Sequence, residues 1–345
     1  MKKGILLSLI AICVAICACL WSLPAARATQ PDRMPTALYV GIADVNLFIR
    51  NAPSADAETI GQINQGDKVY VVEYEPYWVK VVKGTEQSWV SGYVRREYVI
   101  NPTSLAGAVY PYGTTPAVYT AVIAKDTMLY PEPKTGGVPL FKLTKGAKVA
   151  ILSIEDGWAR VIYWQQYGFF YLDAIEDLTP VFGEDLAGPG DTISAFISFY
   201  RIDHENFNDN RMHNIALACD YISVEIGAGE VFNYDEVAGP YQGVRGYREA
   251  NSFYNGQTVL SYGGGCCQVS STMYNVLLAM PKGIEVTNRR AHGKSSISYL
   301  PYGVDAASGN KDQGINLIFN NKYSFPIRLE AIAHDGVLFI ALSKV

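Results

Sequence analysis

Two adjacent cysteines, Cys266 and Cys267, are the residues of this chain best suited to covalent chemistry. They follow three glycines in the segment GGGCCQVSSTMYN, residues 263–275. Apolar residues then recur at helical spacing as far as Met280, which predicts a flexible glycine loop leading into a helix. Both cysteines then lie at the helix N-terminus, where the helix dipole favours a thiolate. The glycines allow close approach of a substrate backbone and leave N–H groups for a developing oxyanion.

A cysteine nucleophile needs a base, and the body of the chain contains few histidines. His292 lies downstream of the cysteines, and Asp305 follows in the same stretch. The order Cys, His, Asp fits a nucleophile, a base and an orienting carboxylate. Structural roles are the alternatives: His292 satisfying a buried carbonyl, Asp305 in a turn, and residues 270–272 serving the first helical turn.

The cysteine count bears on whether these thiols are free. Three of the six cysteines lie near the N-terminus, at positions 13, 17 and 19, which leaves Cys219, Cys266 and Cys267 in the body. An odd number does not complete a disulfide framework. Cys219 falls on the apolar face of a predicted helix over 210–222, with Asn210 as its cap, and is interpreted as a small buried hydrophobe. A vicinal disulfide, or a bridge from Cys219, stays an open alternative.

Cofactor chemistry receives no support from the pattern. Neighbouring cysteines converge poorly on one tetrahedral metal, and the chain has no C-x-x-C. The glycine run lacks the lysine of a phosphate loop. We therefore expect no metal and no cofactor.

The N-terminus is a predicted export segment, residues 1–28. Two lysines precede an apolar run over 4–23, and Ala26-Arg27-Ala28 fits a signal-peptidase site. The run is long for a signal peptide, so an uncut membrane anchor is one alternative, and a lipoprotein site at Ile16-Cys17-Ala18-Cys19 is another. In every case the body lies outside the cytoplasmic membrane. The net charge of -5 gives no indication of nucleic-acid binding.

An internal repeat with an offset of 80 positions occupies the first half of the body. It pairs residues 60–82 with residues 140–162, including Trp78 with Trp158. Each copy consists of short strand-like runs broken by Gly, Pro, Asn and Asp, which predicts two small β-barrels over 36–101 and 117–178. Residues 101–116 and 179–191 have the composition of linkers. A mixed α+β domain over 191–345 follows, with strands expected around 315–319 and 327–329.

Each repeat resembles the bacterial SH3 domain, through the pattern K-G-x-K-V, strand, G-W-x-K-V, strand, G-Y-V. The first copy fits well, and the second is more diverged. The resemblance implies binding to peptidoglycan stem peptides or cross-bridges. The alternative is that Trp78 and Trp158 are core residues and the modules are spacers.

The last domain resembles the VanW domain. Six blocks carry the resemblance in order: VFNYDEVAGPY, RGY, GGGCCQVSSTMYN, RRAH, SYLPYGVDA and LIFNNKYSFPIRL. The likeness implies an L,D-transpeptidase that makes 3-3 cross-links in peptidoglycan through a cysteine. The family pattern G-G-G-x-C-Q places that cysteine on Cys267, and the family histidine matches His292. Where the family has Gly-Arg-Asp-Ala, this chain has Val304 before Asp305.

The resemblance also implies substrate-binding residues. If the missing family arginine binds a substrate carboxylate, another arginine must replace it, and the candidates are Arg245, Arg289 and Arg290. Backbone groups around the glycines would hold the oxyanion, and the RGY block would contact substrate. The expected contacts are Gly264, Gly265, Gln268, Arg245, Tyr247 and Arg290.

Three functions fit these observations. The first is an extracytoplasmic, wall-associated L,D-transpeptidase with a Cys267 thioester. The second is a cysteine peptidase or carboxypeptidase, in which water resolves the same thioester. The third is a wall-binding protein without catalysis, which would tolerate loss of Cys267. The fold class predicted for all three is two SH3-like barrels followed by a VanW-like α+β domain.

Overall fold

The computed structural model describes residues 33–74, 78–105, 116–205, 207–254, 257–292, 297–301, 303–309 and 314–345. The predicted export segment, residues 1–28, lies outside these ranges, as does most of the first predicted linker. Within the described ranges, no helix combines the length and apolarity needed to cross a membrane.

The first repeat forms an antiparallel sheet in the order β3-β2-β6-β5-β4-β1-β7. Its strands alternate buried and exposed residues, as in β1, so that one face closes over a small apolar core. Trp78 is buried in this module, with the Arg95 guanidinium over its ring. The elements are β1 Tyr39–Ala43, β2 Leu47–Arg50, β3 Thr59–Ile63, β4 Lys68–Tyr74, β5 Trp78–Thr85, β6 Ser88–Arg95, η1 Arg96–Tyr98 and β7 Val99–Ser104.

The second repeat is divided into smaller sheets, in the orders β10-β9, β11-β8-β15 and β12-β13-β14. Trp158 makes edge contacts with Tyr130 and Tyr171. The elements are β8 Tyr119–Ile123, β9 Thr127–Leu129, β10 Phe141–Leu143, β11 Lys148–Ile151, β12 Ser153–Glu155, β13 Trp158–Tyr163, β14 Gln166–Tyr171, η2 Leu172–Ala174 and β15 Ile175–Pro180.

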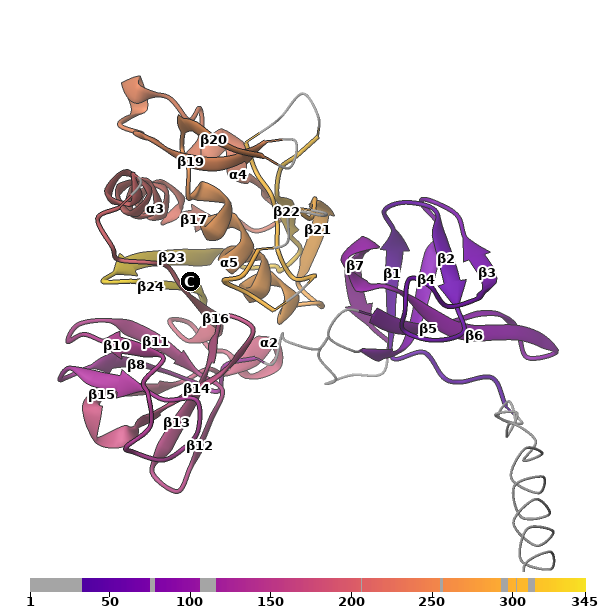
Figure 1. Ribbon diagram of the computed structural model, residues 1–345, viewed down its shortest axis with the longest axis horizontal. Coiled ribbons are helices and arrows are strands. Elements are labelled where there is room, and N and C mark those ends of the chain that lie inside the picture. Colours follow the sequence, from indigo (N-terminus) through magenta and orange to yellow (C-terminus); the bar gives the residue numbers. More distant parts are fainter. Residues whose placement is uncertain are drawn as a thin grey trace, which may run out of the picture. The chain divides into compact units, whose positions relative to one another are not determined.

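A four-stranded antiparallel sheet, β16-β24-β23-β17, is the framework of the last domain. Helices α3 and α5 cover one face of it (Figure 1). The other face packs on the second repeat, where Phe199 contacts Phe141 and Tyr163. Because both faces are covered, β16 is buried over nearly its whole length. The strands are β16 Thr192–Phe199, β17 Glu225–Ile226, β23 Ile327–His334 and β24 Val337–Lys344.

A second sheet, β18-β22-β21, and a hairpin, β19-β20, complete the domain. The strands predicted near 315–319 and 327–329 are present as β22 and β23, although β22 begins later than expected. The remaining elements are α2 Gly183–Leu186, α3 Asn208–Ile222, β18 Val231–Asn233, α4 Tyr234–Ala238, η3 Gly243–Arg245, β19 Glu249–Tyr254, β20 Gln257–Tyr262, α5 Cys266–Leu278, β21 Ile284–Asn288 and β22 Ile318–Asn321.

The segment with linker composition, 179–191, is an ordered part of the last domain. It contains α2, and the Glu184 carboxylate accepts hydrogen bonds from the Tyr323 hydroxyl and the Gly283 amide. Its glycine and proline content reflects tight turns, because Gly183 and Gly190 both have positive φ. This segment is therefore no free tether between domains.

Helix α3 differs from its prediction at one end. It begins at Asn208, two residues before the predicted cap, and the residue preceding it, Phe207, is left-handed with φ of 64°. The Asn210 side chain donates instead to the Glu249 carbonyl. Cys219 is buried on the inner face of this helix, which confirms its interpretation as a small hydrophobe.

Candidate active site

The glycine run before the cysteines is a tight turn, where the sequence pattern had indicated a flexible loop. Gly263 and Gly265 have positive φ. A Cβ on Gly264 would lie 2.7–2.8 Å from backbone atoms of Ala250 and Asn251. Only glycine fits such a position, and the close packing fixes where α5 begins.

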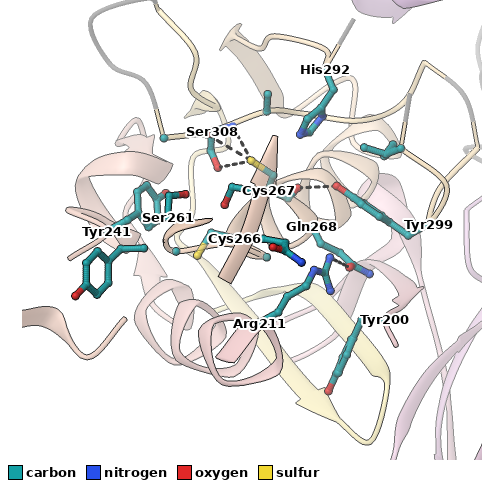
Figure 2. A pocket seen from close by; sticks show the side chains of 18 of the residues that line it. Tyr200, Arg211, Tyr241, Ser261, Cys266, Cys267, Gln268, His292, Tyr299 and Ser308 are labelled. Carbon is teal, nitrogen blue, oxygen red and sulfur yellow. Dashed lines mark hydrogen bonds between the residues drawn. The ribbon is translucent and has the colours of Figure 1, made fainter. Parts of the chain in front are cut away.

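The two cysteines occupy the first turn of α5 and point in different directions (Figure 2). Cys266 is buried, and burial raises the pKa of its thiol well above the ordinary value. The Cys267 sulfur faces a pocket of about 1330 Å³. All three cysteines of the described chain are free thiols. Only Cys267 combines access with a position at the helix N-terminus.

His292 and Asp305 converge on Cys267. The His292 Nδ1 lies 2.6 Å from Asp305 Oδ2, and the same oxygen accepts from the His292 amide at 2.7 Å. This arrangement leaves Nε2 for the thiol side of the ring, and Figure 2 shows the ring beside Cys267. Residues brought together in this way match the nucleophile, base and orienting group expected from their order.

The electrostatics favour a charged pair. Burial opposes ionisation of Cys267, but hydrogen bonding and charge from His292, together with Ser308, outweigh it and lower the pKa of the thiol below 9.0. Burial also disfavours protonated His292, but bonds to Asp305 and Cys267 outweigh it and raise the pKa of the ring to about 10. Both shifts favour thiolate and imidazolium together near neutral pH.

Asp305 is held as a carboxylate. Burial opposes its charge, but the His292 bonds and the Arg289 guanidinium outweigh burial and lower the pKa of Asp305 to about 2. Arg289 is fully buried and donates to both the carbonyl and the carboxylate of Asp305. This arginine therefore supports the triad and is not free for a substrate carboxylate.

The polar residues that follow the cysteines fasten the Asp305 segment to α5. Ser270 and Ser271 donate to the Ala306 carbonyl, and the Ala306 amide donates to Ser271. The Asn275 side chain donates to the Val304 carbonyl. The helix that carries Cys267 therefore also sets the position of the Asp305 carboxylate, 38 residues later in the chain.

Several residues expected to bind substrate make other contacts. The Gln268 side chain is buried and bonds to Arg211, Ser198 and the Phe199 carbonyl. Tyr247 is buried and donates to the Ala238 carbonyl. The polar groups of both side chains are therefore engaged in contacts within the protein, although the sequence alone had left them available to a substrate.

The candidate arginines are also engaged. Arg245 donates to the Val237 carbonyl and lies 4.0 Å from the centre of the Tyr221 ring. Arg290 forms an ion pair with Asp44 of the first repeat. Neither residue lines the pocket beside Cys267. Gly265 does line it, while Gly264 acts through its packing.

The pocket residues that the sequence did not predict include Ser308, Tyr299, Arg211 and Trp164. Ser308 donates its amide to the Cys267 sulfur at 3.5 Å, and Tyr299 donates to the Cys267 carbonyl. Arg211 falls in the apolar stripe of α3 with Ile215, Cys219 and Ile222, which was an available signal. Nothing in the sequence marked the fourth, Trp164.

Trp164 lines the pocket from the turn between β13 and β14 of the second repeat. It stacks on Tyr163 at 5.3 Å, and the adjacent Gln165 donates to the Ile297 carbonyl of the last domain. Because this repeat shares a core with strands β16 and β24 of the last domain, it forms part of the pocket wall.

The geometry defines a domain with a cysteine, histidine and aspartate site at a helix N-terminus. Residues 210–343 match the VanW like protein family, and residues 45–100 match the bacterial SH3 domain. The chain thus contains a VanW-like domain preceded by a bacterial SH3 domain, as the sequence blocks indicated.

Two curated relatives come from Bacillus subtilis (strain 168). "Uncharacterized protein YoaR" is 32% identical over 136 residues, which cover 39% of this chain and 43% of the relative. "Putative N-acetylmuramoyl-L-alanine amidase YrvJ" is 25% identical over 121 residues, which cover 34% of this chain and 23% of the relative. The chain therefore spans less than half the length of either relative.

Among solved structures, NlpC2 from Trichomonas vaginalis is similar at 13% identity, with 55% of this chain and 58% of that chain covered. Its TM-score of 0.16 is too low to support a structural comparison.

Proposed function

We propose that this protein is a cysteine-dependent L,D-transpeptidase that forms 3-3 cross-links between peptidoglycan stem peptides. The observation that carries the proposal is the pairing of Cys267 and His292 at one pocket, with Asp305 bonded to the His292 ring. A thiolate at a helix N-terminus, paired with an oriented imidazolium, is equipped for acyl transfer.

In the first half-reaction the Cys267 thiolate attacks the carbonyl carbon of the third residue in a donor tetrapeptide. The tetrahedral intermediate collapses as the C–N bond to the terminal D-Ala breaks. Protonated His292 supplies the proton to the leaving amine from Nε2, because Nδ1 is bonded to Asp305. D-Ala departs and a thioester remains on Cys267.

Backbone amides at the start of α5 would stabilise the oxyanion. The Cys266 and Gln268 amides already donate to the Gly263 and Gly265 carbonyls. We assign the oxyanion contact to the Cys267 amide, which points out of the first helical turn.

In the second half-reaction an amine on the third residue of a neighbouring stem attacks the thioester. Neutral His292 takes the proton of that amine, the new amide forms, and the thiolate leaves. The charged pair of Cys267 and His292 is thereby restored for the next cycle.

The comparisons support an extracytoplasmic, wall-associated role. The bacterial SH3 domain gives a module of a kind that binds peptidoglycan, and one relative is described as a putative N-acetylmuramoyl-L-alanine amidase. We propose the second repeat as a diverged SH3-like module that has become part of the catalytic pocket, on the evidence of its shared core and Trp164.

The test uses a disaccharide-tetrapeptide and mass spectrometry of the products. The mature protein should give a dimer with loss of one D-Ala, and Cys267→Ala should give none. Cys266→Ala is the matched control. The Cys266 side chain is buried, so this variant should still form the dimer.

Other products would support the alternative functions. A shortened monomer without dimer identifies a carboxypeptidase, in which water resolves the thioester. No product from reduced protein, with wall binding retained, would favour a non-catalytic wall-binding protein and overturn the proposal.

A further inference from the structure

Arg211 is a charged residue of the pocket that the contacts among Cys267, His292 and Asp305 do not involve. It extends from α3, lines the same pocket as Cys267, and donates to the Gln268 amide oxygen at 2.7 Å (Figure 2). That partner is neutral. Among the described residues, no ion pair joins Arg211 to a carboxylate.

The Arg211 guanidinium is partly buried, and a cation withdrawn from water without an anionic partner is destabilised. The free-energy cost of removing a cation from water is offset when an anion pairs with it in good geometry. Burial lowers the pKa of Arg211, the direction expected when a cation lacks compensation. The four other donors of the guanidinium can meet a planar carboxylate through two parallel bonds.

The other arginines near the site are already paired. Arg201 also lines the pocket, but it forms an ion pair with Asp203. Arg289 pairs with Asp305, and Arg290 with Asp44. Within the described part of the pocket wall, Arg211 is the arginine left for an anionic ligand.

Resting on the proposed transpeptidase activity, we propose that Arg211 binds a carboxylate of the acyl-donor peptide and so sets donor specificity. The carboxylate is either the terminal one of D-Ala or the side-chain one of the third residue, and the same contact chemistry serves both.

The experiment compares three donors on the full mature chain: the free tetrapeptide, its terminal carboxamide, and its third-residue side-chain carboxamide. The readout is the rate of thioester formation on Cys267, measured by intact-protein mass at limiting donor. A charge-assisted bond predicts that wild type discriminates against one of the two amides by about 10- to 100-fold. The disfavoured amide identifies the carboxylate that is bound.

Arg211→Gln should reduce that discrimination to about 1-fold, while Arg211→Lys should retain part of it. Gln at position 211 keeps a donor for Gln268, so the wall contact has a replacement. A merely structural arginine would lower all three rates together and leave their ratio unchanged, which would overturn the proposal. Equal rates for all three donors on wild type would overturn it and leave the transpeptidase intact. Absence of acylation from every donor would contradict both the Arg211 contact and the proposed transpeptidase activity.

Discussion

The carboxylate of Asp305 should control the reactivity of Cys267, although the two side chains act through His292. Protonated His292 has its pKa raised from 6.5 to about 10. This difference corresponds to about 5 kcal/mol of net stabilisation of the charged ring, at 1.36 kcal/mol per pKa unit. Asp305 supplies the largest contribution that raises this pKa, through the 2.6 Å bond to Nδ1.

Asp305→Asn removes that charge and keeps the side-chain volume. Loss of even about 2 kcal/mol of the stabilisation makes the thiolate–imidazolium pair roughly 30-fold less populated relative to the neutral pair. We expect iodoacetamide to alkylate Cys267 about 10- to 30-fold more slowly at pH 7, with the half-maximal rate at higher pH. Transpeptidation should fall further, by about 10²- to 10⁴-fold, because an amide also permits the wrong tautomer.

The assay follows alkylation of Cys267 by peptide mass spectrometry in a Cys266→Ala background. Asp235→Asn is the matched control, because Asp235 lines the same pocket but bonds to Tyr241 and Gly309. Circular dichroism checks the fold, since Asp305→Asn also leaves Arg289 buried without its counter-ion. An unchanged pH profile in folded Asp305→Asn would refute the reasoning.

Three further changes test other parts of the structure. Gly264→Ala should lower the free energy of unfolding by about 1–3 kcal/mol, because its Cβ would lie 2.7 Å from a backbone atom. Gly137→Ala is the control in urea unfolding and should be near neutral, because Gly137 has open space around it. The pKa of Asp305 is lowered from 3.8 to about 2 in the folded protein, which stabilises the folded state by about 2 kcal/mol above pH 4. This stabilisation is lost as the pH falls toward 2, and Asp305→Asn should abolish this part of the acid sensitivity of folding. Trp164→Ala should raise KM for the tetrapeptide donor severalfold with a smaller change in kcat, whereas unchanged kinetics would exclude the second repeat from substrate binding.

The features that depend on local sequence pattern could be predicted without a structure. Apolar residues at helical spacing fixed α5 and placed the cysteines at its start, since periodicity reflects which face is buried. The ordered motif blocks identified the VanW-like domain, and the strand and turn pattern of the first repeat identified the SH3 domain. The order of Cys267, His292 and Asp305 pointed to the residues that the fold brings together.

Packing between distant segments determines which side chains remain available to bind a ligand. Composition cannot show that the polar groups of Gln268 and Tyr247 bond to backbone carbonyls within the protein. It also cannot show that Arg290 pairs with Asp44, which lies 246 positions earlier in the chain. Nor can it show that residues 179–191 pack firmly, because glycine and proline serve tight turns as well as linkers. Arg211 and Trp164 entered the site because α3 and the β13–β14 turn converge on α5, and such contacts depend on packing between distant segments rather than on local spacing.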